Sequence, residues 1–335
     1  MFRDVRYGSL AGRLAQESKI KRMRPGFYPS LFCALWLAAL GVTPARAGSI
    51  SLPPEASQAM EKMYGGDPEA AIEILHSFER EQPHNSIGYL LEAEAQWWKI
   101  YCAACDIKWG MVDAWRRGKK PEDDTYLALA DKAIQLAQAQ LVKSDSAEMH
   151  LYMGTGWSLK VRLYSLRGEN RNVVRAAVTA RTEFLRANQI DPQMADAKVG
   201  LGLYNYYVDT LSPIVKLLRF FMGIPGGNKK EGIRQLETGM DQGALMVVEA
   251  RFYLAKNLRT YDEQYSRAAT IMEPLVARYP HNPIFLLLLG NLNAELRRNA
   301  KASEYFHSAL NSAIPDSACA IRTRDLADKF LLSLH

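Results

Sequence analysis

The chain has 335 residues, 48% of them hydrophobic, so it can bury a substantial core as one elongated domain or two compact ones. Its formal net charge of +6 is concentrated near the N-terminus: residues 1–47 hold eight of the 42 basic residues and two of the 36 acidic ones, which leaves 34 of each in residues 48–335. A body of zero net charge lacks the basic excess that drives binding to a phosphate backbone, so we expect no nucleic-acid partner.

The first 47 residues have the order of parts that is typical of an export signal. A basic segment ending in KIKRMR precedes the apolar run FYPSLFCALWLAALGV, and Ala45 and Ala47 supply the small residues of a cleavage site. We therefore expect a signal peptide over residues 1–47, or one that starts at Met23, because the basic region is long for such a signal. The protein would then be exported, most simply to a bacterial periplasm. The alternative is an uncleaved membrane anchor, because about 16 apolar residues fall just short of a bilayer span.

Residues 48–335 predict a single all-α domain. Apolar positions recur at helical spacing, Gly, Pro, Asn and Asp cluster between the segments, and no alternating strand pattern occurs. We expect about a dozen helices of roughly 12–25 residues with short connectors.

Cys102 and Cys105 lie in the stretch YCAACD, inside a long predicted helix. A redox pair of this spacing usually sits at a helix N-terminus after a strand, where the thiol pKa is lowered. No strand precedes this pair, so we favour two small residues on a crowded helix face that can oxidise to a local disulfide. A thiol–disulfide catalyst is the alternative. Covalent haem would need His in place of Asp106, and zinc would need a second ligand pair, so we expect no cofactor and no metal.

The segment PIFLLLLGNLNAELRRNAKASEYFHSAL, within 283–316, shows the repeat most clearly. A Leu-Gly pair in its first helix, followed by Ala-x3-Phe-x2-Ala in its second, resembles the tetratricopeptide repeat of 34 residues. Glycine permits two helices to cross closely, and the large residue fills the space between hairpins, which stack because one hairpin cannot bury its own apolar face. The resemblance implies a right-handed solenoid of stacked helical hairpins; the alternative is a helical bundle without repeats. The residues that define the repeats are Gly154, Gly202, Gly290, Ala302, Phe306 and Ala309.

Tetratricopeptide repeats line a concave groove with fixed positions of the first helix in each hairpin. Transferred to ADAKVGLGLYNYY and to the last repeat, these positions suggest residues for an extended peptide, whose backbone an asparagine would hold. The peptide-groove candidates are Asp196, Val199, Leu203, Tyr206, Tyr207, Asn291 and Glu295. The alternative for the two tyrosines is packing beneath an inserted helix.

Residues 210–228 interrupt the repeat rhythm. An apolar run from Leu211 to Met222, broken by Lys216 and Arg219, predicts a short inserted hydrophobic helix. The glycines of the following GIPGGNKKEG do not form a nucleotide-binding loop, because no Ser or Thr follows the lysines and no strand precedes them. We expect Gly226 and Gly227 to permit the turn out of the helix.

The stretch 200–240 also resembles the hallmark region of the tetratricopeptide-repeat-39 family. The residues that carry the resemblance are Gly202, Tyr204, Asn205, Pro213, Lys216, Leu217, Leu218, Phe220, Gly223, Gly226, Gly232, Gln235, Leu236, Glu237 and Gly239. The resemblance implies a helical repeat fold with an inserted hydrophobic helix, a role in protein binding or scaffolding, and no known catalytic residues.

No HExxH, GxSxG or Ser/His/Asp grouping appears, and the six histidines are scattered. We therefore expect a non-catalytic scaffold that binds another protein or peptide in the bacterial cell envelope. Two other classes remain open: an accessory protein that docks on a membrane through residues 211–222, and an enzyme whose site assembles from distant residues.

Overall fold

The computed structural model describes residues 50–105, 117–312, 314 and 317–334. Within these ranges it contains fourteen α-helices and no strand, which confirms the prediction of an all-α chain. The helices are α1 (Pro54–Tyr64), α2 (Pro68–Glu81), α3 (Ser86–Ala104), α4 (Glu122–Leu141), α5 (Ala147–Leu166), α6 (Asn170–Ile190), α7 (Ala195–Thr210), α8 (Pro213–Phe221), α9 (Lys229–Gln242), α10 (Val247–Tyr261), α11 (Tyr265–Arg278), α12 (Pro283–Glu295), α13 (Asn299–Ser312) and α14 (Ala318–Leu332). The predicted signal peptide, residues 1–47, lies outside the described ranges, as does its alternative start at Met23.

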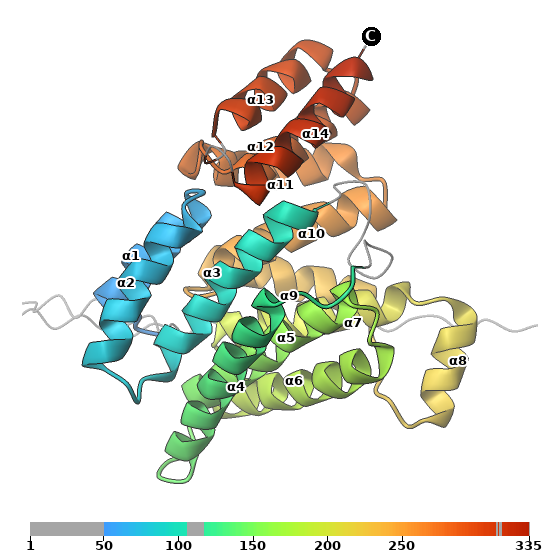
Figure 1. Cartoon of the computed structure of the whole chain (residues 1–335). Coiled ribbons are helices and arrows are strands. Elements are labelled where there is room, and N and C mark those ends of the chain that lie inside the picture. The colour runs from blue at the N-terminus through green and yellow to red at the C-terminus, as the bar shows by residue number, and fades with distance from the viewer. Residues whose placement is uncertain (1–49, 106–116, 313, 315–316, 335) are drawn as a thin grey trace, which may run out of the picture. The chain divides into compact units, whose positions relative to one another are not determined.

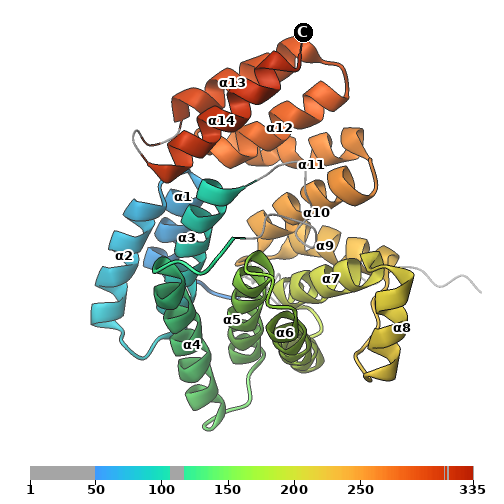
Figure 2. The same cartoon turned by 45° about the vertical axis from the view of Figure 1, so that its right-hand side comes forward.

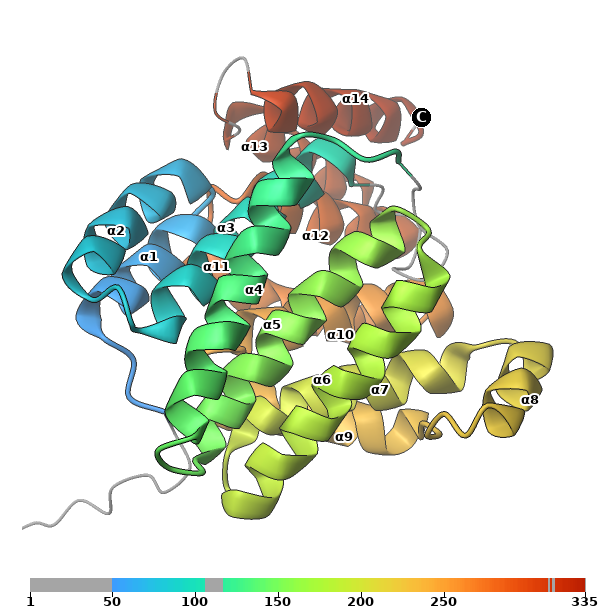
Figure 3. The same cartoon turned by 60° about the horizontal axis from the view of Figure 1, so that its bottom comes forward.

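The helices pack in chain order, as stacked hairpins do. Each helix contacts the next one along the chain, except that α7 packs on α9 and passes over α8 (Figure 1). Helices α4, α5, α6 and α7 lie side by side in this order (Figure 3). Most of the connectors are short, and capping residues begin several helices sharply. Asn282, for example, accepts hydrogen bonds from the backbone N–H groups of Ile284 and Phe285, with Pro283 in the first turn of α12.

Helices from near the two ends of the stack contact each other. Helix α14 packs against α3 (Figure 2). Helix α1 is also tied to later helices: the side-chain amide of Asn282, in the connector before α12, donates a hydrogen bond of 2.9 Å to the carbonyl oxygen of Tyr64, and Arg278 of α11 forms an ion pair with Glu61. The repeats therefore do not end in two open faces.

An aromatic cluster fills the space where these hairpins meet. The ring of Trp98 on α3 lies 5.7 Å from Tyr64 of α1, 5.2 Å from Phe252 of α10 and 5.6 Å from Phe285 of α12, measured between ring centroids. Edge-to-face contacts of this kind add about 0.5–1.5 kcal/mol per pair to the burial of the rings themselves. The cluster joins four helices that are far apart in the sequence into one core.

Candidate functional site: an apolar groove beneath helix α8

The chain between α7 and α9 forms a short helix held on two loops. Ser212 caps α8 by accepting a hydrogen bond of 3.5 Å from the backbone N–H of Val215, and Pro213 occupies the first turn. The helix ends at Phe221, and Gly223 just beyond it has a positive φ of 67°, which favours glycine over other residues. Asn228 then caps α9. The loop thus ends one helix and starts the next, but the glycine with positive φ is Gly223 and not Gly226 or Gly227, the two predicted to permit the turn.

Helix α8 leaves its apolar side chains largely exposed. None of its residues is buried, and it has no extensive packing with any other helix in the described ranges. All three views show it at the edge of the helical stack, joined to it by α7 and the loop before α9 (Figures 1–3). The exposed apolar side chains in this segment are Ile214, Val215, Leu217, Leu218, Phe220, Phe221 and Met222. Isolated apolar residues are common on protein surfaces, but seven in one segment mark a contact surface.

A groove of about 500 Å³ lies between α8 and the body of the stack. Its walls come from α5, α6 and α7, and Val215, Leu218 and Met222 close it from the side of α8. Ile214, Leu217, Phe220 and Phe221 do not line it. We call these four residues the outer patch of α8. The volume lies within the range of about 300–1,000 Å³ that is usual for ligand pockets.

The charged residues that line the groove are all arginines: Arg162, Arg181 and Arg219. Arg181 lies with its guanidinium carbon 5.4 Å from the ring centroid of Tyr204, and Arg219 donates a hydrogen bond of 3.0 Å to the carbonyl oxygen of Ile224. No carboxylate in the described ranges forms an ion pair with Arg181 or Arg219. Burial raises the pKa of the Tyr204 hydroxyl, and the charges of both arginines oppose this shift. Arg181 and Arg219 therefore place two positive charges near Tyr204.

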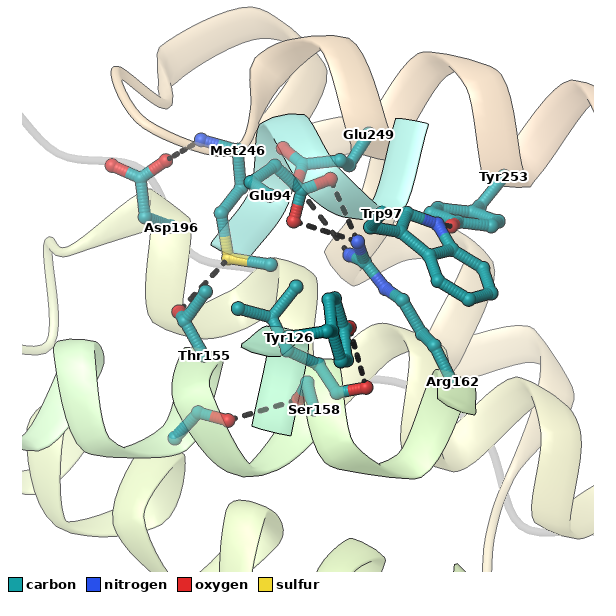
Figure 4. Close-up of polar contacts among 12 residues, drawn as sticks. Glu94, Trp97, Tyr126, Thr155, Ser158, Arg162, Asp196, Met246, Glu249 and Tyr253 are labelled. Atoms are coloured by element: carbon teal, nitrogen blue, oxygen red, sulfur yellow. Dashed lines mark hydrogen bonds and ion pairs between the residues drawn. The ribbon is translucent and has the colours of Figure 1, made fainter. Parts of the chain in front are cut away.

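Arg162 differs because it is paired with acidic side chains. It reaches from α5 to Glu94 of α3, to whose two carboxylate oxygens it donates hydrogen bonds of 2.7 Å, and it lies 3.4 Å from Glu249 of α10 (Figure 4). All three side chains are buried, and the rings of Trp97 and Tyr253 flank the guanidinium. Burial raises the pKa of Glu249 to about 8; the carboxylate of Glu94 adds to the shift and Arg162 opposes it. At neutral pH the Glu249 carboxyl group is therefore mostly protonated.

The cysteines form a different bond from the one predicted. Cys102 of α3 is bonded to Cys319 of α14, with the two Cα atoms 4.9 Å apart. Cys105 is buried outside the disulfide, and its thiol donates to the carbonyl oxygen of Cys102. The predicted local pairing of Cys102 with Cys105 is therefore wrong. The contact between α3 and α14 brings Cys319 to Cys102, and a prediction from local spacing could not find it.

The described residues contain no group of three or more His, Cys, Asp or Glu side chains that could hold a metal ion. None of the helices in the described ranges is long and apolar enough to span a membrane.

Comparison with known proteins classifies the fold. The family model described as tetratricopeptide repeat matches residues 257–318, which run from α10 to the start of α14. The chain therefore contains tetratricopeptide-repeat sequence in this region. No curated protein matches it.

Two solved structures with low sequence identity are also similar. One is a human IFIT1 dimer with PPP-AAAA, which has 14% identity over 81% of this chain and 59% of the IFIT1 chain, with a TM-score of 0.41. The other is yeast Tom70, with 10% identity, 83% and 88% of the two chains covered, and a TM-score of 0.28. This chain therefore spans about three fifths of the length of the IFIT1 chain. The matched residues 257–318 do not include 200–240, so the likeness to the tetratricopeptide-repeat-39 family remains a prediction.

The glycines at the Leu-Gly positions of the tetratricopeptide repeats face large side chains. A β-carbon placed on Gly290 would lie 2.6 Å from Cε1 of Phe306, and one on Gly154 would lie 2.7 Å from Cε1 of Phe184. A β-carbon on Gly202 would lie 2.9 Å from the carbonyl oxygen of Gly232. Ala302, Phe306 and Ala309 are buried on α13. These positions have the close crossings that the repeat pattern implies.

The structure does not bring the seven peptide-groove candidates together on one surface. Asp196, Val199 and Tyr206 are fully buried, and Asn291 is 3% exposed. Asp196 accepts hydrogen bonds from the backbone N–H groups of Ala244 and Met246, at 3.0 Å and 2.7 Å, and so holds the connector between α9 and α10. It is a structural residue in this fold.

The remaining candidates divide into three groups. The hydroxyl of Tyr206 donates a hydrogen bond of 2.6 Å to Asp262, and Arg259 binds both Asn291 and Glu295. Only Leu203 and Tyr207 line the groove beneath α8. The two tyrosines therefore lie in different places. Tyr207 lies under the inserted helix, as the alternative prediction placed both tyrosines, whereas Tyr206 lies in the core.

Proposed function

We propose that this chain is a non-catalytic scaffold that binds a partner protein through the outer patch of α8, Ile214, Leu217, Phe220 and Phe221. The observation that carries the proposal is the exposure of these side chains, which ranges from 57% for Leu217 to 75% for Phe221. Water contact with four large apolar groups on one short helix is unfavourable by about 25 cal/mol per Å² of apolar surface, and a partner that covers them gains this free energy. Proteins of the tetratricopeptide-repeat type generally bind protein partners, which agrees with this assignment.

We further propose that the protein acts outside the cytoplasm, in a bacterial cell envelope. Two features support the location. Residues 1–47 have the pattern of an export signal, and the Cys102–Cys319 disulfide is of the kind that persists in oxidising compartments and is rare in the cytosol. N-terminal sequencing of the mature protein tests the location: a chain that begins at Gly48 supports it, and an intact leader on cytosolic protein contradicts it.

Photo-crosslinking tests the protein partner. A photoreactive amino acid replaces Phe220 in one variant and Val142 in a control, because Val142 is also apolar and is 86% exposed but follows α4, away from α8. We expect one discrete crosslinked protein from position 220 and none from position 142. The charged variant Phe221→Glu should abolish the crosslink without changing thermal stability, because the side chain is already in water. Equal crosslinking from both positions would reject the outer patch as the binding surface.

A second candidate is docking of α8 on a membrane surface, which the same exposed residues favour. Lys216 and Arg219 are the only basic side chains on α8, and Lys216 is paired with Asp209, so there is little attraction to anionic lipids. Co-sedimentation with liposomes of mixed neutral and anionic lipids separates the two candidates. Sedimentation that Phe221→Glu abolishes, together with the absence of a crosslinked protein, would replace the scaffold by a membrane accessory protein.

A further inference from the structure

The groove beneath α8 has apolar walls and an unbalanced positive charge. Its lining residues include three arginines and no carboxylate. Arg162 is paired with Glu94 and lies beside Glu249, but no ion pair within the described ranges involves Arg181 or Arg219. A ligand of the groove should therefore be largely apolar and carry a negative charge at one end.

The donors near Tyr204 define the charged end. Arg181 lies over the Tyr204 ring, whose hydroxyl donates a hydrogen bond of 2.8 Å to the carbonyl oxygen of Pro225. Arg219 uses one nitrogen for Ile224, but its Nε is buried without a hydrogen-bond partner. A buried donor without an acceptor is unfavourable. An anionic oxygen placed between Arg181 and Arg219 would supply the missing negative charge.

The walls of the groove favour an alkyl chain over a peptide. Two of its polar groups already form hydrogen bonds inside the protein. The hydroxyl of Tyr207 donates a hydrogen bond of 2.9 Å to Asn257, and the hydroxyl of Ser158 donates one of 2.9 Å to the carbonyl oxygen of Gly154. An extended peptide would bury N–H groups with few acceptors to meet them, which is unfavourable. A helical peptide satisfies its own backbone, but a helix is about 10–12 Å across, so the groove would hold only about one turn.

From this geometry we propose that the groove binds one long-chain fatty acid, with its alkyl chain between α6, α7 and α8 and its carboxylate between Arg181 and Arg219. This inference goes beyond the scaffold function and concerns the opposite side of α8 from the outer patch. The chain would pack against Leu203 and Val208 of α7 and against Val215 and Leu218 of α8. It would also give α8 an apolar surface on which to rest.

Equilibrium binding to the delipidated full chain tests the proposal, with saturated fatty acids of 8 to about 14 carbons below their aggregation concentrations and their methyl esters as probes. We expect affinity to rise about fourfold for each added methylene until the groove is full. The methyl ester of the same length should bind at least tenfold more weakly, because it cannot form charge-assisted hydrogen bonds. Equal affinity of acid and ester, or no dependence on chain length, would overturn the proposal.

Three variants locate the ligand. Arg219→Gln and Arg181→Gln should each weaken binding of the acid about tenfold and leave binding of the ester unchanged. Arg175→Gln is the matched control, because Arg175 lies on the same helix as Arg181, is exposed and does not line the groove. Equal losses in all three variants would contradict the carboxylate position, and binding of an apolar peptide in place of the acid would contradict the ligand class. Crosslinking from position 220 is unaffected by these outcomes, so failure here leaves the scaffold proposal standing.

Discussion

Loss of the Cys102–Cys319 disulfide should lower stability more than any other single change at a cysteine. The bond joins residues 217 positions apart. In the chain-entropy model, a crosslink that closes a loop of this length stabilises the folded state by about 5 kcal/mol, because it restricts the unfolded chain. Cys319→Ser should therefore lower the free energy of unfolding by up to about 5 kcal/mol. At an m-value near 3 kcal/mol/M, the urea midpoint would fall by roughly 2 M.

The assay is urea unfolding of the oxidised wild type, Cys319→Ser and Cys105→Ser, followed by peptide mapping without reductant. We expect mapping to recover Cys102 linked to Cys319 in the wild type and in Cys105→Ser. Reductant should lower the wild-type midpoint to that of Cys319→Ser. A Cys102–Cys105 link, or a Cys319→Ser variant as stable as the oxidised wild type, would refute the reasoning.

Three further substitutions test the core by chemical denaturation. Folding raises the pKa of Glu249 from its ordinary value of 4.5 to about 8. The contribution of Glu249 to stability is therefore complete below pH 4.5 and is lost as the pH rises through 8. The variant Glu249→Gln should flatten the decline in the free energy of unfolding between pH 4.5 and pH 8. Asp196→Ala should cost about 2–4 kcal/mol, because it leaves two backbone N–H groups without an acceptor, whereas a cost below about 1 kcal/mol would show that water replaces the carboxylate. Gly290→Ala should cost about 1–3 kcal/mol through its overlap with Phe306. Gly118→Ala, where a β-carbon meets nothing within 4 Å, should change stability by less than about 0.5 kcal/mol, and equal effects of the two alanines would contradict the proposed crossing.

The fold could be predicted because its signals are local. The spacing of Gly290 and Phe306 reflects contact between two helices of one hairpin, and a hairpin is short enough to be recognised within one repeat. The break between α7 and α9 was visible for the same reason, since Pro213 and Gly223 mark the two ends of α8. A local pattern does not show which helices from further along the chain cover a given hairpin.

This limit explains the placement of the candidate peptide-groove residues. The assignment of groove positions within one repeat assumes that the inner face of α7 is open to solvent. In the structure, however, the connector before α10 covers Asp196, and Asp262 after α10 accepts a hydrogen bond from Tyr206. These contacts span about 50 residues of sequence and depend on how tightly successive hairpins curve. The groove beneath α8 could be foreseen only in part, through Leu203 and Tyr207, because its walls come from four helices. Arg181 and Arg219 carry no signal in the sequence that separates them from other surface arginines.

The contact between α3 and α14 has a consequence for how this stack unfolds. In an open array each terminal unit interacts with a single neighbour, so it can fray while the remainder stays folded. Here α14, the last helix, packs on α3 near the start of the stack, and the Cys102–Cys319 disulfide joins these two helices covalently. Deleting the last helix would also strip its support from the third, and truncations at either end should melt the chain cooperatively rather than shorten it by one repeat.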